Sequence, residues 1–124
     1  MPVALAVALG GALGASGRFA LDTLIERRTE SLFPWATFTI NMTGCLAVGF
    51  IVAALVDRHR APIWVRTGLV VGVCGGFTTY STFAQETVDL LEARHAAVAA
   101  ATVGATVGLG LVAVFVGSRL GRLV

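Results

Sequence analysis

The sequence contains no lysine, and its charged residues make up only 13% of the 124 residues. A typical soluble domain carries about 25% charged residues. Four stretches hold no charged residue at all: 1–17, 31–56, 67–85 and 96–118. A surface helix of a soluble protein needs charged side chains on one face, so these stretches exclude a soluble helical bundle.

Cysteine and histidine are also scarce, with two of each. Cys45 and Cys74 both fall inside uncharged stretches, where two thiols form neither an extracellular disulfide framework nor a spaced set of metal ligands. His59 and His95 fall in connecting segments and are interpreted as surface residues. The net charge of +2 is too small to indicate a nucleic-acid partner. Without a nucleophile–base pair or a metal cluster, the sequence does not predict an enzyme.

The uncharged stretches are long enough to cross a bilayer, because a membrane-spanning helix needs about 20 apolar residues. They predict an all-α membrane protein with one domain over residues 1–124. The four predicted transmembrane helices cover residues 3–21, 34–56, 63–84 and 96–117. The first stretch also raises the alternative of a cleaved signal peptide, but no basic residue precedes it, as the start of such a peptide requires.

Basic residues are nearly balanced between the two sides of a four-span protein. One side holds Arg58, Arg60, Arg66, Arg119 and Arg122, and the other holds Arg18, Arg27, Arg28 and Arg94. Orientation in the membrane follows this bias, and here the bias is almost absent. Either local context orients the chain, or the chain inserts in both directions. In the second case a two-fold axis in the membrane plane becomes available, and an antiparallel homodimer is the natural assembly.

Glycines recur at a spacing of four residues in the predicted helices. They are Gly10 and Gly14; Gly68, Gly72 and Gly76; Gly104 and Gly108; and Gly117 and Gly121. Such smooth faces let helices approach closely in lipid. The spacing does not tell whether the contacts lie within one chain or between two. Four short helices are too thin to enclose a polar path and shield it from lipid, so we expect an oligomer.

The least apolar part of the third predicted helix is the segment 75–83, GGFTTYSTF. Its two glycines lower the cost of a helix break, and its hydroxyls satisfy or compete for the freed backbone groups. We therefore expect a break near residues 75–79. A break at mid-membrane exposes carbonyl oxygens and half-helix ends, which bind ions in channels and transporters. Tyr80 and Phe83 share a helix face, and their electropositive ring edges suit an anion. A glycine hinge with aromatic packing is the alternative.

Other polar side chains lie in or beside the predicted helices. Thr37 and Asn41 share a face of the second helix, and Asn41 carries more donors and acceptors than one helix satisfies. Thr102 and Thr106 are one turn apart in the fourth helix. Instead of lining a polar path, each threonine hydroxyl can also donate a hydrogen bond to a carbonyl one turn back in its own helix. Arg18 follows the first uncharged stretch, where it either snorkels to the interface or supplies positive potential to an anion path.

The segment 75–83 closely resembles the third-helix signature of the Fluc (CrcB-type) fluoride channels, GG-x-TT-F-ST-F. Further segments match this family in the same order: 14–19 (GASGRF), 37–44 (TFTINMTG) and 110–117 (GLVAVFVG). The likeness covers essentially the whole chain. It implies a dual-topology, antiparallel homodimer in the inner (plasma) membrane with two fluoride pathways. Such a passive channel exports fluoride from the cytoplasm and lowers its toxicity.

The resemblance also implies roles for individual residues. Phe83 corresponds to the second pore phenylalanine, and Tyr80 stands where the first is usually Phe. Asn41 corresponds to the pore asparagine, Ser81 to a hydroxyl of the same polar track, and Thr37 to a threonine one turn from that asparagine.

The remaining correspondences concern the fourth helix, the vestibule and a bound cation. Thr102 and Thr106 stand where the family often has Tyr and Ser, and Arg18 matches an arginine near the vestibule. Gly75 and Thr78 match residues whose backbone carbonyls, from both subunits, hold a structural Na⁺. Neutral carbonyl oxygens are hard ligands that suit such a cation.

Two other functions fit a small membrane protein of this kind. A dual-topology multidrug transporter needs a carboxylate embedded in a span, and none of the four predicted spans contains Asp or Glu. A non-transporting membrane subunit would explain the glycine faces but not the hydroxyl and amide groups.

Overall fold

The computed structural model describes residues 1–56 and 61–124, and these residues form helices joined by turns. Arg58, His59 and Arg60 therefore lie outside the described residues. Three helical rods coincide with the first, second and fourth predicted spans. They are α1 (Val3–Glu26), α2 (Trp35–Ile51) with its π-helical continuation η1 (Val52–Val56), and α6 (Ala96–Gly121). Each rod is long and apolar enough to cross a membrane.

The third predicted span consists of two separate helical parts. The first runs through α3 (Ile63–Thr67), η2 (Gly68–Cys74) and α4 (Gly75–Phe77), and the second is α5 (Tyr80–Glu92). Between them Thr78 and Thr79 are extended, with ψ angles of 159° and 116°. The expected break is therefore present, and α5 continues beyond the predicted end at residue 84.

The two glycines of the segment are not the break itself, contrary to the expectation that their missing Cβ atoms open the helix. Gly75 is helical, with φ −65° and ψ −37°, and Gly76 follows it in α4. A Cβ on Gly76 would lie 2.7 Å from the carbonyl oxygen of Gly11 in α1. The small size of Gly76 therefore serves close packing, while the extended residues after it form the break.

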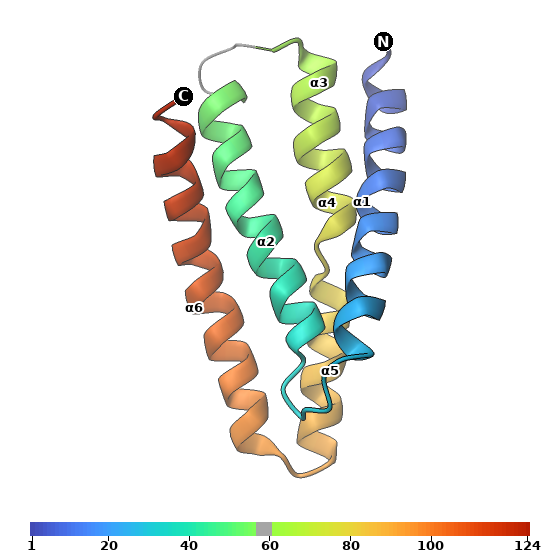
Figure 1. The fold of residues 1–124 in the computed structure, drawn as a ribbon, viewed down its shortest axis with the longest axis vertical. Helices are drawn as coiled ribbons and strands as arrows, with labels where there is room; N and C mark the ends of the chain where they lie inside the picture. The colour runs from blue at the N-terminus through green and yellow to red at the C-terminus, as the bar shows by residue number, and fades with distance from the viewer. Residues whose placement is uncertain (57–60) are drawn as a thin grey trace.

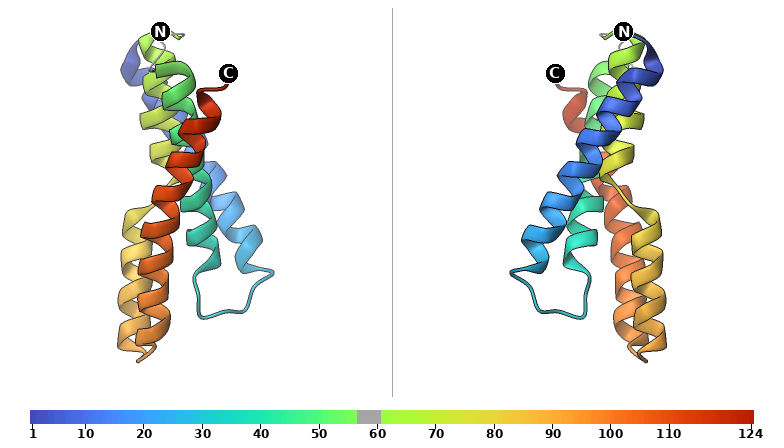
Figure 2. Two further views of the ribbon diagram at one scale, coloured as in Figure 1. Left: turned by 90° about the vertical axis from the view of Figure 1, so that its left-hand side faces the viewer. Right: turned by 90° about the vertical axis from the view of Figure 1, so that its right-hand side faces the viewer.

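The helices form two closely packed pairs. α2 lies along α6, and α1 lies along η2 and α4 (Figure 1). Both termini lie at one end of the molecule, at the top of Figure 1. Below the break, α5 stays beside α6 while α1 and the lower part of α2 lean to the other side (Figure 2). The lower half of the molecule therefore has two arms that meet near the break.

Glycine faces hold these pairs together inside one chain. A Cβ on Gly14 would overlap a backbone carbonyl of η2, and one on Gly117 would overlap a backbone carbonyl of α2. By contrast, Gly104 and Gly108 of α6 meet nothing within 4 Å. Most of the predicted glycine contacts are thus intramolecular, as close backbone approach in lipid requires.

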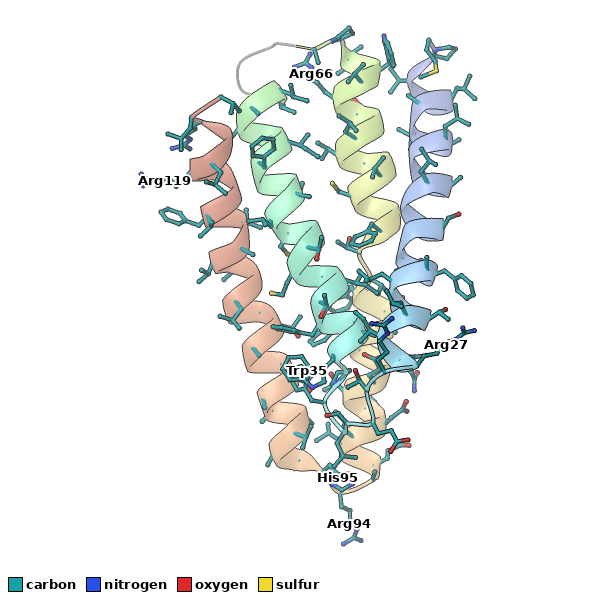
Figure 3. All side chains as sticks on the ribbon, in the orientation of Figure 1. Arg27, Trp35, Arg66, Arg94, His95 and Arg119 are labelled. Atoms are coloured by element: carbon teal, nitrogen blue, oxygen red, sulfur yellow. The ribbon has the colours of Figure 1, made fainter. Side chains whose placement is uncertain are left out.

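Large apolar side chains cover the outside of the bundle. Leu13 is 70% exposed, Phe19 72% and Leu111 70%. Such a continuous apolar exterior marks a surface that meets lipid or another protein. Charged side chains gather toward the ends: Arg66 and Arg119 toward the upper end, and Arg94 with the exposed His95 at the lower turn (Figure 3).

Candidate functional site

Asn41 of α2 bonds to the backbone at the break. Its Nδ2 donates to the Thr79 carbonyl at 3.0 Å, and its Oδ1 accepts the Thr79 N–H at 2.9 Å. Both residues are buried. The sequence predicts a packing or pore contact for Asn41, and the structure shows that its amide satisfies both backbone groups of one extended residue. An extended peptide inside an apolar bundle needs such partners.

Thr79 also begins the second half of the broken helix. Its Oγ1 accepts the Thr82 N–H at 3.2 Å and donates to the Thr82 Oγ1 at 3.0 Å. A threonine side chain in this position is an N-cap, which satisfies one of the free N–H groups at a helix start. The hydroxyls of the segment therefore hold the break open, as expected.

Because of these bonds, two backbone carbonyl groups lose the N–H donors that they would have in a continuous helix. In an unbroken helix the Thr79 N–H would bond to the Gly75 carbonyl, and the Thr82 N–H to the Thr78 carbonyl. Instead the first N–H bonds to Asn41 and the second to the Thr79 hydroxyl. Gly75 and Thr78 are the two residues whose carbonyls the resemblance assigns to a cation.

A cavity of about 410 Å³ lies beside the break, where α2, η2, α5 and α6 meet. Six of the predicted site residues line it: Asn41, Gly75, Thr78, Tyr80, Phe83 and Thr106. The rings of Tyr80 and Phe83 lie 5.9 Å apart and are tilted by 54°. Phe83 is buried, whereas Tyr80 is 80% exposed on the outer side of the break.

A second cavity of about 190 Å³ lies on the other side of Thr79, which lines both cavities. Arg18, Asp22, Thr37 and Thr82 are among the residues that line it. The half-buried Arg18 donates from Nε to the Gly76 carbonyl at 3.3 Å. Arg18 thus reaches inward from α1 to the end of α4, rather than only snorkelling to the interface.

Glu86 of α5 is a site residue that the sequence analysis missed. Its Oε1 accepts a hydrogen bond from the Thr37 Oγ1 at 2.8 Å, and it lines a third cavity of about 270 Å³ together with Glu26. Its Oε2 is buried and has no hydrogen-bond partner among the described residues. Burial raises the pKa of Glu86; the Thr37 bond lowers it, and the nearby charges of Asp22, Glu26 and Asp89 raise it further.

The position of Glu86 in the sequence carried a usable signal. It follows Phe83 by three residues, so both side chains share one face of α5. Glu86 was not predicted as a site residue because it lies two residues beyond the predicted end of the third span at residue 84. Through Thr37, Glu86 connects the third cavity to the second.

Two further predicted residues lie outside these three cavities. The Thr102 hydroxyl is fully buried and donates to the Val98 carbonyl one turn back at 2.8 Å, which is the alternative role for a membrane threonine. Ser81 is exposed, with its hydroxyl 3.4 Å from the Thr79 hydroxyl. Neither residue lines any of the three cavities described above.

The apolar exterior defines this chain as a small multi-pass membrane protein. The polar groups at its broken helix have the features of an ion-conducting site. Residues 5–118 match the family described as "CrcB-like protein, Camphor Resistance (CrcB)". The chain belongs to the CrcB-like family, which confirms the resemblance.

Curated relatives match almost the full length of the chain. "Fluoride-specific ion channel FluC 2" of Symbiobacterium thermophilum is 43% identical over 92% of this chain and 93% of its own. "Fluoride-specific ion channel FluC" of Pseudomonas fluorescens is 39% identical over 99% of both chains. The protein of the same name from Paracoccus denitrificans is 43% identical over 95% of this chain and 93% of its own.

Proposed function

We propose that this protein is a fluoride-selective passive channel of the inner (plasma) membrane, which exports F⁻ from the cytoplasm and thereby lowers fluoride toxicity. The observation that carries the proposal is the convergence of amide, hydroxyl and aromatic groups on one helix break. The names of the relatives in the same family agree with it.

The chemistry of the site suits a small, strongly hydrated anion. Asn41 uses one of its two amide N–H donors on Thr79, which leaves the second for a ligand in the cavity. The edges of Phe83 and Tyr80 supply weak positive potential beside it. Donors of this strength replace the water of fluoride without trapping the ion, as conduction requires.

The proposed route follows the polar groups from the lower end of the protomer. Glu86 and Thr37 stand at its entrance, Arg18 lines the cavity that follows, and Asn41 with the two aromatic rings lines the next. Ser81, Thr102 and Thr106 remain proposed members of the pathway by resemblance.

The proposed assembly is an antiparallel, dual-topology homodimer in which all four spans of the single domain cross the bilayer. Two observations support a second copy. Tyr80 and Gly75 are both exposed beside the break, so polar groups there would face lipid unless a second copy covers them. The near balance of basic residues permits both orientations.

The proposed cofactor is a structural Na⁺ held by the Gly75 and Thr78 carbonyls of both subunits. The residues fit this group, because these carbonyls have lost their helical donors and border the same cavity. Bound there, the cation would neutralise the negative ends of the broken helices.

The test is fluoride efflux from liposomes that contain the purified protein, followed with a fluoride electrode beside chloride-loaded vesicles. Fluoride release without chloride release supports the channel. Release that requires a proton gradient and extends to cationic drugs would favour a multidrug transporter. No release from well-folded dimers would favour a non-transporting membrane subunit.

A further inference from the structure

Arg18 connects α1 to the last turn before the helix break. Its Nε donates to the Gly76 carbonyl at 3.3 Å, across 58 residues of sequence. One turn earlier in α1, Gly14 packs so closely that a Cβ would lie 2.8 Å from the Phe77 nitrogen. The backbone of α1 is therefore held against α4 at the point from which Arg18 extends.

The end of a helix leaves carbonyl groups without donors and carries partial negative charge. At this end, the Cys74 carbonyl accepts the Thr78 N–H and the Thr78 hydroxyl, both at 3.0 Å. The Gly76 carbonyl accepts from Arg18. On the other side of the break, Asn41 bonds to both backbone groups of Thr79. Side chains from α1 and α2 thus bond to the backbone just before the break and at the break itself.

We propose that Arg18 is a positioning residue, which caps the end of α4 through its Nε and so keeps the Gly75 and Thr78 carbonyls in place for a cation. The cap also removes the Gly76 carbonyl from the set of free oxygens at the break. The part that concerns the cation rests on the proposed function; the capping of α4 does not.

A pair of substitutions separates the hydrogen bond from the charge. In Arg18→Gln, the side-chain nitrogen occupies the place of the arginine Nε, so the donor is kept and the charge is lost. In Arg18→Met, the side chain reaches as far as that of glutamine but carries no donor and no charge. Arg28→Met is the control, because Arg28 is exposed in the turn after α1.

The deciding measurement is amide hydrogen exchange of the segment 78–83, followed by mass spectrometry on the full chain in lipid nanodiscs. We expect exchange in Arg18→Met to be faster by about tenfold, because a helix end without its cap opens more often. Arg18→Gln and Arg28→Met should exchange like the wild type.

The capping role would be overturned by equal exchange in Arg18→Met and the wild type. Equal acceleration in Arg18→Gln and Arg18→Met would also overturn it. If Arg18→Met does not assemble, assembly of Arg18→Gln supports the cap and failure of both overturns it.

A titration with Na⁺ tests the connection to the cation, with the thermal unfolding midpoint as the readout. Loss of a residue that orients ligands weakens metal affinity about 10- to 100-fold. Loss of a neighbouring positive charge alone would strengthen it. We therefore expect Arg18→Met to need more Na⁺ than the wild type, and an unchanged or lower requirement contradicts the positioning role. A wild type that does not respond to Na⁺ would remove the cation from the proposed function, and hydrogen exchange would still decide the cap.

Discussion

Asn41 and Thr79 exchange two hydrogen bonds, at 3.0 and 2.9 Å, between a side-chain amide and a backbone peptide. This pair replaces bonds that an unbroken helix would have made, and it makes the break a defined structure. It also ties α2 to the break, so a change in Asn41 alters both the backbone and the adjoining cavity.

Asn41→Asp should reduce fluoride efflux from liposomes by at least about tenfold, since an unsatisfied buried polar group costs about 1–3 kcal/mol. The carboxylate would place an acceptor against the Thr79 carbonyl and a negative charge in an anion route. Thr43→Val is the matched control, because the Thr43 hydroxyl bonds to the Thr39 carbonyl of its own helix. Wild-type efflux in Asn41→Asp would contradict the assignment.

Phe83→Ile should lower efflux about tenfold while the dimer still forms, because isoleucine fills the space but offers no electropositive ring edge. Phe38→Ile serves as the control, since Phe38 packs edge-on against Phe33 and Trp35 outside the cavity. Size-exclusion chromatography reports assembly. Unchanged efflux would remove Phe83 from the pathway.

Glu86 should make stability depend on pH. Burial raises its pKa in the folded chain, so the folded state binds a proton that the unfolded state has already released. Stability should therefore fall as pH rises from the ordinary carboxyl pKa through the raised one. Glu86→Gln should flatten this fall in thermal unfolding, whereas Glu92→Gln, at the end of α5, should keep it. Parallel profiles for Glu86→Gln and the wild type would contradict the prediction.

Gly14→Ala should impair folding, because its Cβ would overlap the backbone of η2 and α4. Gly11→Ala, on the same helix, meets nothing within 4 Å and should be tolerated. We expect the first variant to lower the thermal unfolding midpoint strongly and the second to leave it unchanged or higher, as alanine favours helices by about 1 kcal/mol over glycine. Equal midpoints would contradict the close α1–α4 packing.

Arg94→Gly should stabilise the turn after α5. Arg94 has φ 63°, and the His95 N–H bonds to the Leu90 carbonyl at 2.8 Å, as in a Schellman motif. A non-glycine residue in this conformation costs about 1–2 kcal/mol. The unfolding midpoint should rise in Arg94→Gly and fall in Ala93→Gly, since Ala93 has φ −76°. A lower midpoint in Arg94→Gly would contradict this account.

The sequence by itself determined the class of protein, the approximate helices, the presence of a break and the family. These properties follow from local causes: long runs without charge demand an apolar environment, and a cluster of hydroxyls competes with helical hydrogen bonds. The polar face shared by Thr37 and Asn41 was predictable for the same reason, because helical spacing alone sets it.

Tertiary structure decided which groups those polar side chains meet. The bond from Thr37 to Glu86 joins residues 49 apart, and the bond from Arg18 to Gly76 joins residues 58 apart. Local spacing carries no information on such pairs, so the role of Glu86 and the inward direction of Arg18 emerged only from the packing. The same packing explains why the break lies after Gly75 and Gly76. Gly76 remains helical because its small size permits close contact between α1 and α4. Side chains from α1 and α2 stabilise the residues around the break that follows.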